Sequence, residues 1–279
     1  MDMAIQLTGI EKSRSGKIRV RAKSKSNTAI KLLIFVLLAI SVMALLTFDY
    51  KDIDLGKAIA DTFTNIKTVF LAPKLSRGML ADILYQLLVT FCLGALSTVF
   101  GMILAFFCSL LCAQNIADKR IANVVKSIVA FVRAVPTVLW VLIFAISAGL
   151  GSVAAVLGLT FHSFAYLTKV YAEAIEEIDS GTIEALRASG AGFLQIVTQA
   201  ILPSSLSYMV AWTFMRFEIN FTNAVAMGAA AGAGGIGFNL FMAGSFYFDL
   251  REMGALTYIV VIAVVLLEML STKIKSKAK

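Results

Sequence analysis

Long apolar segments alternate with short polar ones along most of the chain. A helix needs about 20 predominantly apolar residues to cross the hydrocarbon core of a membrane. Segments at or near this length occupy residues 32–48, 83–117, 127–148, 153–171, 203–228 and 254–270. The second is long enough for a tilted helix with an extra turn at the membrane surface. The pattern therefore predicts an all-α fold with about six transmembrane helices.

Glycines and prolines are expected to divide or begin several of these helices. Gly149 and Gly151 predict a turn between the third and fourth helices, because glycine favours turns. Pro136 is expected to kink the third helix, since proline interrupts the backbone hydrogen-bond ladder. Pro203 is expected in the first turn of the fifth helix, where a missing N–H is tolerated.

Lysine and arginine residues cluster beside the ends of the predicted helices. Eight of them lie within residues 12–31, three within 119–126 and four within 273–279. Cytoplasmic flanks of membrane helices are enriched in these residues, so both termini are expected to be cytoplasmic. The loop at 49–82 is then external and the polar segment at 172–202 is cytoplasmic.

These boundaries predict one membrane domain with basic ends. The predicted divisions are a basic cytoplasmic tail at 1–31, a first transmembrane helix at 32–48, an external loop at 49–82, a transmembrane domain at 83–271 that contains the cytoplasmic loop 172–202, and a basic cytoplasmic tail at 272–279.

The composition agrees with a membrane protein. Apolar residues make up 59% of the chain and charged residues 15%, whereas soluble domains carry about 25% charged residues. The net charge is +8, but the basic residues flank membrane segments, so anionic lipid headgroups are a better partner than nucleic acid. The three cysteines share one apolar segment without further ligands, and no metal site is expected.

The polar segment contains a recognisable motif. Residues 184–203 read EALRASGAGFLQIVTQAILP. This stretch resembles the EAA loop of ATP-binding-cassette importer permeases, with pattern E-A-A, three residues, G, nine residues, I, one residue, L-P. The matching positions are Glu184, Ala185, Gly190, Leu202 and Pro203, and the departures are Leu186 and Ala200. The resemblance implies a type I importer-like transmembrane domain in a bacterial inner membrane.

The same resemblance implies a division of labour between subunits. The EAA loop would dock onto a cytoplasmic ATPase subunit, so ATP and Mg²⁺ would bind there. This chain would hold no cofactor and would not be an enzyme. The other implied partners are an extracellular or periplasmic substrate-binding protein and a second permease, either another copy or a paralogue.

The residues of the loop also have a physical reading. A break at 180–181 is expected, with a second helix beginning at Thr182 or Ile183. Glu184 would then lie in the first turn, where a carboxylate stabilises the helix dipole. Gly190 would allow another surface to approach closely. The alternative is an ordinary amphipathic helix at the membrane surface.

Three further segments narrow the resemblance. Residues 131–136 with Trp140, residues 172–179 and residues 216–220 are similar to phosphonate-transport permeases. This implies import of phosphonate or a related phosphorus oxyanion. An importer for methionine or another small solute remains an alternative. A non-transporting membrane scaffold or sensor subunit is the alternative from another class.

Two groups of residues are candidates for the translocation path. Arg216 would lie about 20 Å along the fifth helix, near mid-membrane, where ionisable residues face a cavity or a partner. The sequence alone does not decide between two roles for Arg216, one in an anion path and one in helix packing. The full candidate set is Arg216, Glu218, Asn220, Gly232, Gly234, Gly235 and Gly237.

The glycines of this set also leave two readings open. Their N–H groups could meet an anion at a bend near the mouth of the path, or small residues could pack helices tightly. Two other polar residues receive structural readings. His162 is expected to be a packing residue, and Arg133 is expected to extend towards the cytoplasmic surface.

Overall fold

The computed structural model describes residues 10–12, 18–20, 25–48 and 54–277. Much of the two predicted basic tails, 1–31 and 272–279, lies outside the described residues or their described side chains. The chain divides into two compact units, residues 1–60 and 61–279. We describe each unit by itself.

The first unit contains a short hairpin and one apolar helix. Strands β1 (Ile10–Lys12) and β2 (Ile18–Val20) pair antiparallel. Helix α1 (Lys25–Thr47) contains a membrane-length segment at Thr28–Thr47, with mean hydropathy 2.8 and no buried residue. A helix therefore occupies the predicted first transmembrane segment, while the hairpin was not expected from the sequence.

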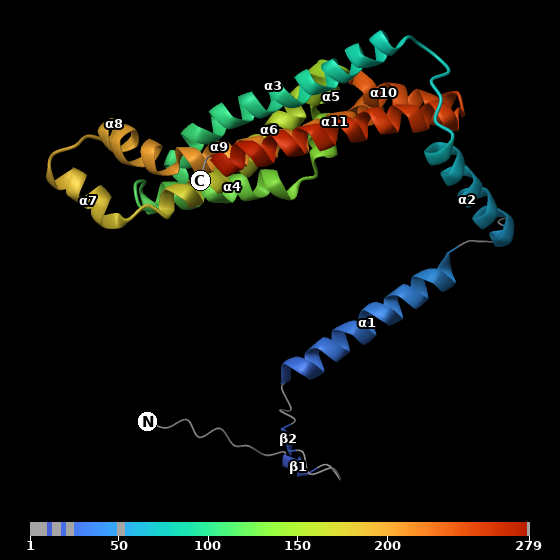
Figure 1. Cartoon of the computed structure of the whole chain (residues 1–279). Coiled ribbons are helices and arrows are strands. Elements are labelled where there is room, and N and C mark those ends of the chain that lie inside the picture. Colours follow the sequence, from blue (N-terminus) through green and yellow to red (C-terminus); the bar gives the residue numbers. More distant parts are fainter. Residues whose placement is uncertain (1–9, 13–17, 21–24, 49–53, 278–279) are drawn as a thin grey trace. The chain divides into compact units, whose positions relative to one another are not determined.

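The second unit is built around four long helices that run side by side (Figure 1). They are α3 (Leu80–Cys112), α6 (Ser152–Glu176), α9 (Leu202–Ala231) and α11 (Leu250–Lys277). Small residues bring α3 close to its neighbours. A β-carbon at Gly101 would lie 2.7 Å from Cβ of Ser163 on α6, and one at Gly94 would lie 3.0 Å from the backbone nitrogen of Phe221 on α9.

The predicted third transmembrane helix is divided in two. Helices α4 (Lys119–Ala134) and α5 (Thr137–Ala148) meet at an angle of 90°. The expected kink at Pro136 is therefore a complete break. Val135 and Pro136 are extended, as a residue before proline and the proline itself prefer. Among the described residues, five helices are long and apolar enough to cross a membrane, or six if the bent pair counts as one span.

The fifth transmembrane helix begins earlier than expected. Helix α8 (Phe193–Ile196), the π-helical turn η1 (Val197–Ile201) and α9 form one apolar run from Phe193 to Ala231. Pro203 lies in the first turn of α9, as predicted, but the apolar run already begins at Phe193. A π turn joins the two parts: the Leu202 N–H donates to the Val197 carbonyl oxygen, and this wider turn accommodates the proline.

Two helices lie where loops were expected. Helix α2 (Leu55–Leu71) occupies much of the predicted external loop 49–82. Helix α10 (Gly235–Phe241) and the π-helical turn η2 (Met242–Phe246) form a short apolar segment between α9 and α11. Helix α2 was missed because it is too polar to be predicted as a membrane span. The segment formed by α10 and η2 was missed because it is too short to cross a membrane.

Candidate functional site

The EAA-like segment forms a helical loop anchored at one end of the second unit. Helix α7 (Ser180–Ala188) begins two or three residues before the expected start at Thr182 or Ile183, because the Asp179 side chain caps it by accepting the Thr182 N–H at 3.1 Å. Glu184 is therefore outside the first turn, and the expected interaction with the helix dipole is wrong. Ile183 is buried in the hydrophobic core beside Ile175.

Gly190 ends α7 through its backbone conformation. Its φ is +85°, and nothing lies within 4 Å of the position of a β-carbon. The Ala191 N–H donates to the Leu186 carbonyl oxygen at 2.9 Å, and the Gly190 N–H donates to that of Arg187 at 3.0 Å. These bonds satisfy carbonyls at the helix end, a role in which glycine avoids the cost of a left-handed conformation.

Polar contacts join this loop to the connection between α3 and α4. The Asn115 side chain donates to the Ile175 carbonyl oxygen at 2.7 Å, and Arg187 donates to the Asn115 carbonyl oxygen at 3.3 Å. Glu176 accepts the Gln114 N–H and forms an ion pair with Lys126, both at 2.8 Å. The segment at 172–202 is thereby bonded to the connection between α3 and α4 and to the side chain of Lys126 on α4.

The motif residues divide between the surface and the core. Glu184, Ala185, Gly190 and Pro203 are exposed, whereas Leu202 is half-buried and packs against the core of α3, α6 and α9. Beside them, Leu194 is 76% exposed. The exposed group forms a surface with both polar and apolar character at this end of the molecule.

Arg216, on α9, is buried against α6. It is only 3% exposed. Its Nε donates to Ser163 Oγ at 3.0 Å, and a terminal nitrogen contacts His162 Nδ1 at 2.8 Å. The guanidinium carbon lies 5.2 Å from the centre of the Tyr166 ring. Within the described part of the chain, no carboxylate forms an ion pair with Arg216.

Asn220 extends this group of hydrogen-bonded polar residues to helix α3. Its side-chain nitrogen donates to Thr98 Oγ1 at 2.9 Å and to Ser163 Oγ at 2.8 Å. Ser163 in turn donates to the Leu159 carbonyl oxygen at 2.6 Å, which leaves its oxygen to accept from Arg216 and Asn220. The network holds the arginine in one position with neutral partners.

His162 completes the network on its half-exposed side. Since Nδ1 faces an arginine donor, Nδ1 must accept, and the ring is neutral with its proton on Nε2. Arg133 lines a cavity of about 240 Å³ between α4 and α6. The cavity is also lined by Lys126 and Lys169, which form ion pairs with Glu176 and Glu173 in its wall.

The other candidate path residues lie elsewhere. Glu218 is half-exposed, and no described residue forms an ion pair with it. Gly232 and Gly234 have φ of +60° and +78° and end α9 before α10. The Gly235 N–H donates to Gln86 Oε1 at 3.1 Å, and a β-carbon at Gly237 would collide with the Val225 carbonyl. These glycines therefore make a close-packed turn against α3 and α9.

Comparison with known proteins identifies the family. Residues 97–274 match binding-protein-dependent transport system inner membrane components, and the match covers more than half of the chain. The chain belongs to this family.

Several transport permeases are similar in sequence to this chain. It is 29% identical over 245 residues to the phosphate-import permease PhnE of Mycolicibacterium smegmatis, covering 87% of this chain and 43% of that protein. It is 32% identical over 186 residues to the phosphite transport system permease PtxC of Stutzerimonas stutzeri, covering 66% of each. It is 28% identical over 196 residues to a probable D-methionine permease, MetI of Pasteurella multocida. The permease spans less than two thirds of the length of the first two relatives.

Solved structures share its fold. A subunit of the inward-facing MetNI methionine transporter has a TM-score of 0.63 and 25% identity, covering 71% of the permease and 96% of that chain. A bacterial alginate transporter, solved with a periplasmic protein that holds an alginate pentasaccharide, has a TM-score of 0.55 at 14% identity and shows the fold alone. The expected all-α, importer-like transmembrane domain is confirmed.

Sequence reasoning missed the partners of Arg216. Ser163 carried no motif, and His162 was expected to be a packing residue without a stated contact. The nearest signal was the position of both residues on one apolar helix that also holds Tyr166. Among the described residues, no group of three or more histidine, cysteine or acidic side chains is arranged to hold a metal ion.

Proposed function

We propose that the permease is the transmembrane subunit of an ATP-driven importer for phosphonate or a related phosphorus oxyanion. It would lie in a bacterial inner membrane with both termini in the cytoplasm. The names of similar proteins support this cargo, since they include permeases for phosphate, phosphite and phosphonate. The methionine permeases among the relatives keep methionine as the second candidate.

The observation that carries the proposal is the buried charge of Arg216. An arginine inside a membrane protein is costly and is usually paired with an acidic group or placed beside a wet cavity. Arg216 contacts Ser163, His162 and Tyr166, all of them neutral. Its positive charge is therefore available to an anion that passes the half-exposed side of His162. A zwitterionic cargo such as methionine would not require this excess of positive charge.

Within this proposal, the remaining candidate residues have distinct roles. Asn220 positions Arg216 through Ser163. Glu218 is half-exposed and lies two residues from Arg216, on a different side of α9. It would contact a second permease copy or the edge of the path. The N–H groups of Gly235 and Ile236 are already bonded to α3 and are therefore not free to bind an anion. The bend formed by Gly232, Gly234, Gly235 and Gly237 would instead shape the mouth of the path.

The proposed coupling uses the exposed surface of the EAA-like loop. A cytoplasmic ATPase would dock on Glu184, Ala185 and the segment around Gly190, with ATP and Mg²⁺ bound to the ATPase and no cofactor in this chain. The polar contacts of Asn115 and Glu176 would carry the motion to α3, α4 and α6. A second copy or paralogue would complete the path, and an external binding protein would deliver the anion.

Uptake by reconstituted vesicles tests the proposal. The permease, its ATPase and its binding protein are placed in proteoliposomes with ATP inside, and uptake of labelled phosphite, methylphosphonate, phosphate and methionine is compared. Saturable uptake of a phosphorus oxyanion, with no competition from methionine, is expected. Uptake of methionine alone would establish the second candidate. A complex that hydrolyses ATP at the same rate with every ligand and moves none would indicate a scaffold or sensor.

A further inference from the structure

Helix α2 has one continuous apolar face. Residues that are three or four positions apart lie on the same side of a helix. The residues at this spacing are Leu55, Ile59, Phe63, Ile66 and Phe70. The opposite side contains Lys57, Asp61 and Asn65. Such a helix is suited to a boundary between an apolar and a polar environment.

The described residues of the second unit leave this face exposed. Ile59 is 57% exposed, Phe63 69% and Ile66 50%. The residues of α2 that are half-buried, Thr68 and Val69 among them, lie outside the apolar face. The apolar face therefore requires an occupant other than the helices of the second unit.

The end of α2 is fastened to the beginning of α11. The Tyr258 hydroxyl donates to the Phe70 carbonyl oxygen at 2.7 Å, and the two rings are packed edge to face with centres 6.2 Å apart. The Val69 backbone lies so close to Gly254 that a β-carbon there would collide with it. The Lys74 N–H then donates to the Arg251 carbonyl oxygen at 3.0 Å.

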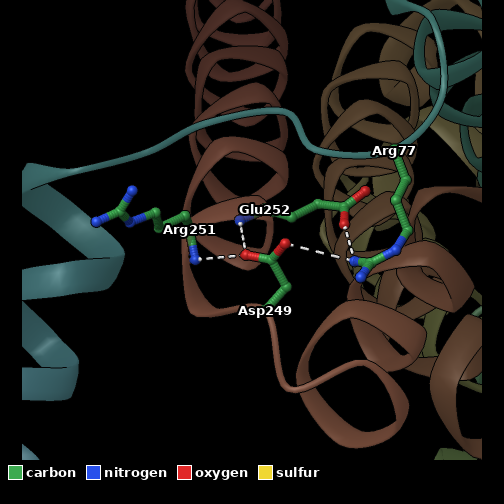
Figure 2. Close-up of polar contacts among 4 residues, drawn as sticks. All are labelled: Arg77, Asp249, Arg251 and Glu252. Carbon is green, nitrogen blue, oxygen red and sulfur yellow. Dashed lines mark hydrogen bonds and ion pairs between the residues drawn. The ribbon is translucent and has the colours of Figure 1, made fainter.

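A cluster of charged residues fastens the segment that follows α2 (Figure 2). Arg77 forms ion pairs with Glu252 at 2.7 Å and with Asp249 at 3.4 Å. Its guanidinium carbon also lies 4.1 Å from the centre of the Tyr247 ring. Asp249 accepts the N–H groups of Arg251 and Glu252 at 3.1 and 3.0 Å. The segment 69–77 is thus held at successive points along the start of α11.

These contacts place the end of α2 beside an apolar part of α11. The segment Leu250–Lys273 is long and apolar enough to cross a membrane. Tyr258 lies about 12 Å along the axis from the start of that helix, at 1.5 Å per residue. In the predicted span 254–270, Tyr258 is the fifth residue, so Phe70 is expected at the level where α11 enters lipid. A tyrosine at this level is typical of the membrane interface.

The location is far from the EAA-like loop. Helix α2 precedes the first residue of α3, Leu80, whereas the loop contacts Gln114 just after its last residue, Cys112. The 33 residues of α3 correspond to about 50 Å. The two features thus occupy opposite membrane faces.

We infer that the apolar face of α2 is embedded in lipid at the membrane face opposite the EAA-like loop. The lipid is favoured over a soluble partner because Phe70 is already at the level of the bilayer, and over water because large apolar side chains would otherwise be solvated. Lys67 borders the face, where its amine reaches lipid headgroups while its stem covers apolar surface. This surface does not depend on which cargo the permease carries.

Fluorescence quenching by lipids tests the inference. The three native cysteines are replaced, and the environment-sensitive dye NBD is attached to Phe63→Cys, Ile59→Cys or, as the control on the polar side, Asn65→Cys. The labelled protein is reconstituted in vesicles that contain phosphatidylcholine with a nitroxide near the headgroup. At least twofold stronger quenching at positions 59 and 63 than at 65 is expected.

Two results would overturn the inference. Equal, weak quenching at all three positions would place α2 in water. A blue-shifted dye at 59 and 63 that lipid nitroxides do not quench would show that protein, such as a second copy, covers the face. The unlabelled variants are compared with the parent by size-exclusion chromatography, so that each reading comes from folded protein.

Discussion

The Trp140 indole N–H donates to the Val132 carbonyl oxygen at 3.0 Å across the break between α4 and α5. In an uninterrupted helix, Val132 would accept from residue 136, but Pro136 has no N–H. The tryptophan thus replaces the donor that the proline removes. Its ring also packs edge to face on Phe161, with centres 4.7 Å apart, so the same side chain joins α4, α5 and α6.

We predict that Trp140→Phe weakens the bend while preserving its aromatic packing. The loss of one hydrogen bond to an otherwise unpaired carbonyl should cost about 1 kcal/mol, and the melting temperature in detergent should fall by a few degrees. Trp212→Phe is the matched control, since that indole contacts rings of Tyr166 and Tyr208 without a corresponding hydrogen bond across a break. Equal losses in both variants would contradict the assigned role.

The exposed position of Ala185 predicts a selective defect in assembly. Trp at this position should fit the free permease, because the residue is exposed on α7, but it should block docking of the ATPase. Co-purification of the ATPase is expected to fall at least tenfold, with unchanged yield of the permease. Val261→Trp, an exposed position on α11, serves as the control for a large added side chain. Normal co-purification of Ala185→Trp would remove α7 from the docking surface.

The left-handed conformation of Gly190 predicts how its substitutions rank. Asparagine adopts this conformation more readily than β-branched residues do. Gly190→Asn should therefore retain most transport, whereas Gly190→Val should lose stability by about 1 kcal/mol or more and uncouple the loop. If both variants lose docking equally without loss of thermal stability, close approach of the partner, and not backbone conformation, explains the glycine.

The Asp249 carboxylate predicts a loss of stability in acid. The N–H of Glu252, followed by other donors, lowers the pKa of Asp249 from its ordinary value of 3.8. A lowered pKa in the folded state means that the stabilisation is complete above the ordinary value and is lost as the pH falls through the folded-state value. As the pH falls below about 4, the melting temperature of the wild type should therefore decrease more steeply than that of Asp249→Asn. Parallel curves would assign the acid sensitivity to other groups.

Membrane segments could be predicted because lipid imposes one requirement on every spanning helix. Hydropathy alone therefore located α1, α3, α6 and α11. The angle at Pro136 could not be predicted, because it depends on the bond between Trp140 and Val132. Pro203 was correctly expected in the first turn of α9, but the extension of the apolar run back to Phe193 was not predicted, because it depends on a π turn. Helix α2 was missed because an amphipathic surface helix has no long apolar run.

The candidate site was predictable only in part. The EAA-like motif located the exposed loop, since its residues are consecutive in sequence. The partners of Arg216 were not predictable, because His162 is 54 residues away and Ser163 is 53 residues away. Only the packing of α6 against α9 brings them together. Similarly, the backbone role of Gly190 follows from a φ angle that a motif does not specify.

The central claim is that the charge of Arg216 serves the passage of an anion. The most direct measurement is uptake of labelled phosphite or methylphosphonate by proteoliposomes that contain Arg216→Gln, Arg216→Lys or the parent, each with equal amounts of bound ATPase. We expect the uptake rate of Arg216→Gln to be at least tenfold lower than that of the parent. Arg216→Lys should retain a measurable uptake rate, because lysine keeps the charge but not the fixed geometry. Full uptake by an assembled Arg216→Gln complex would contradict the claim and leave Arg216 as a packing residue.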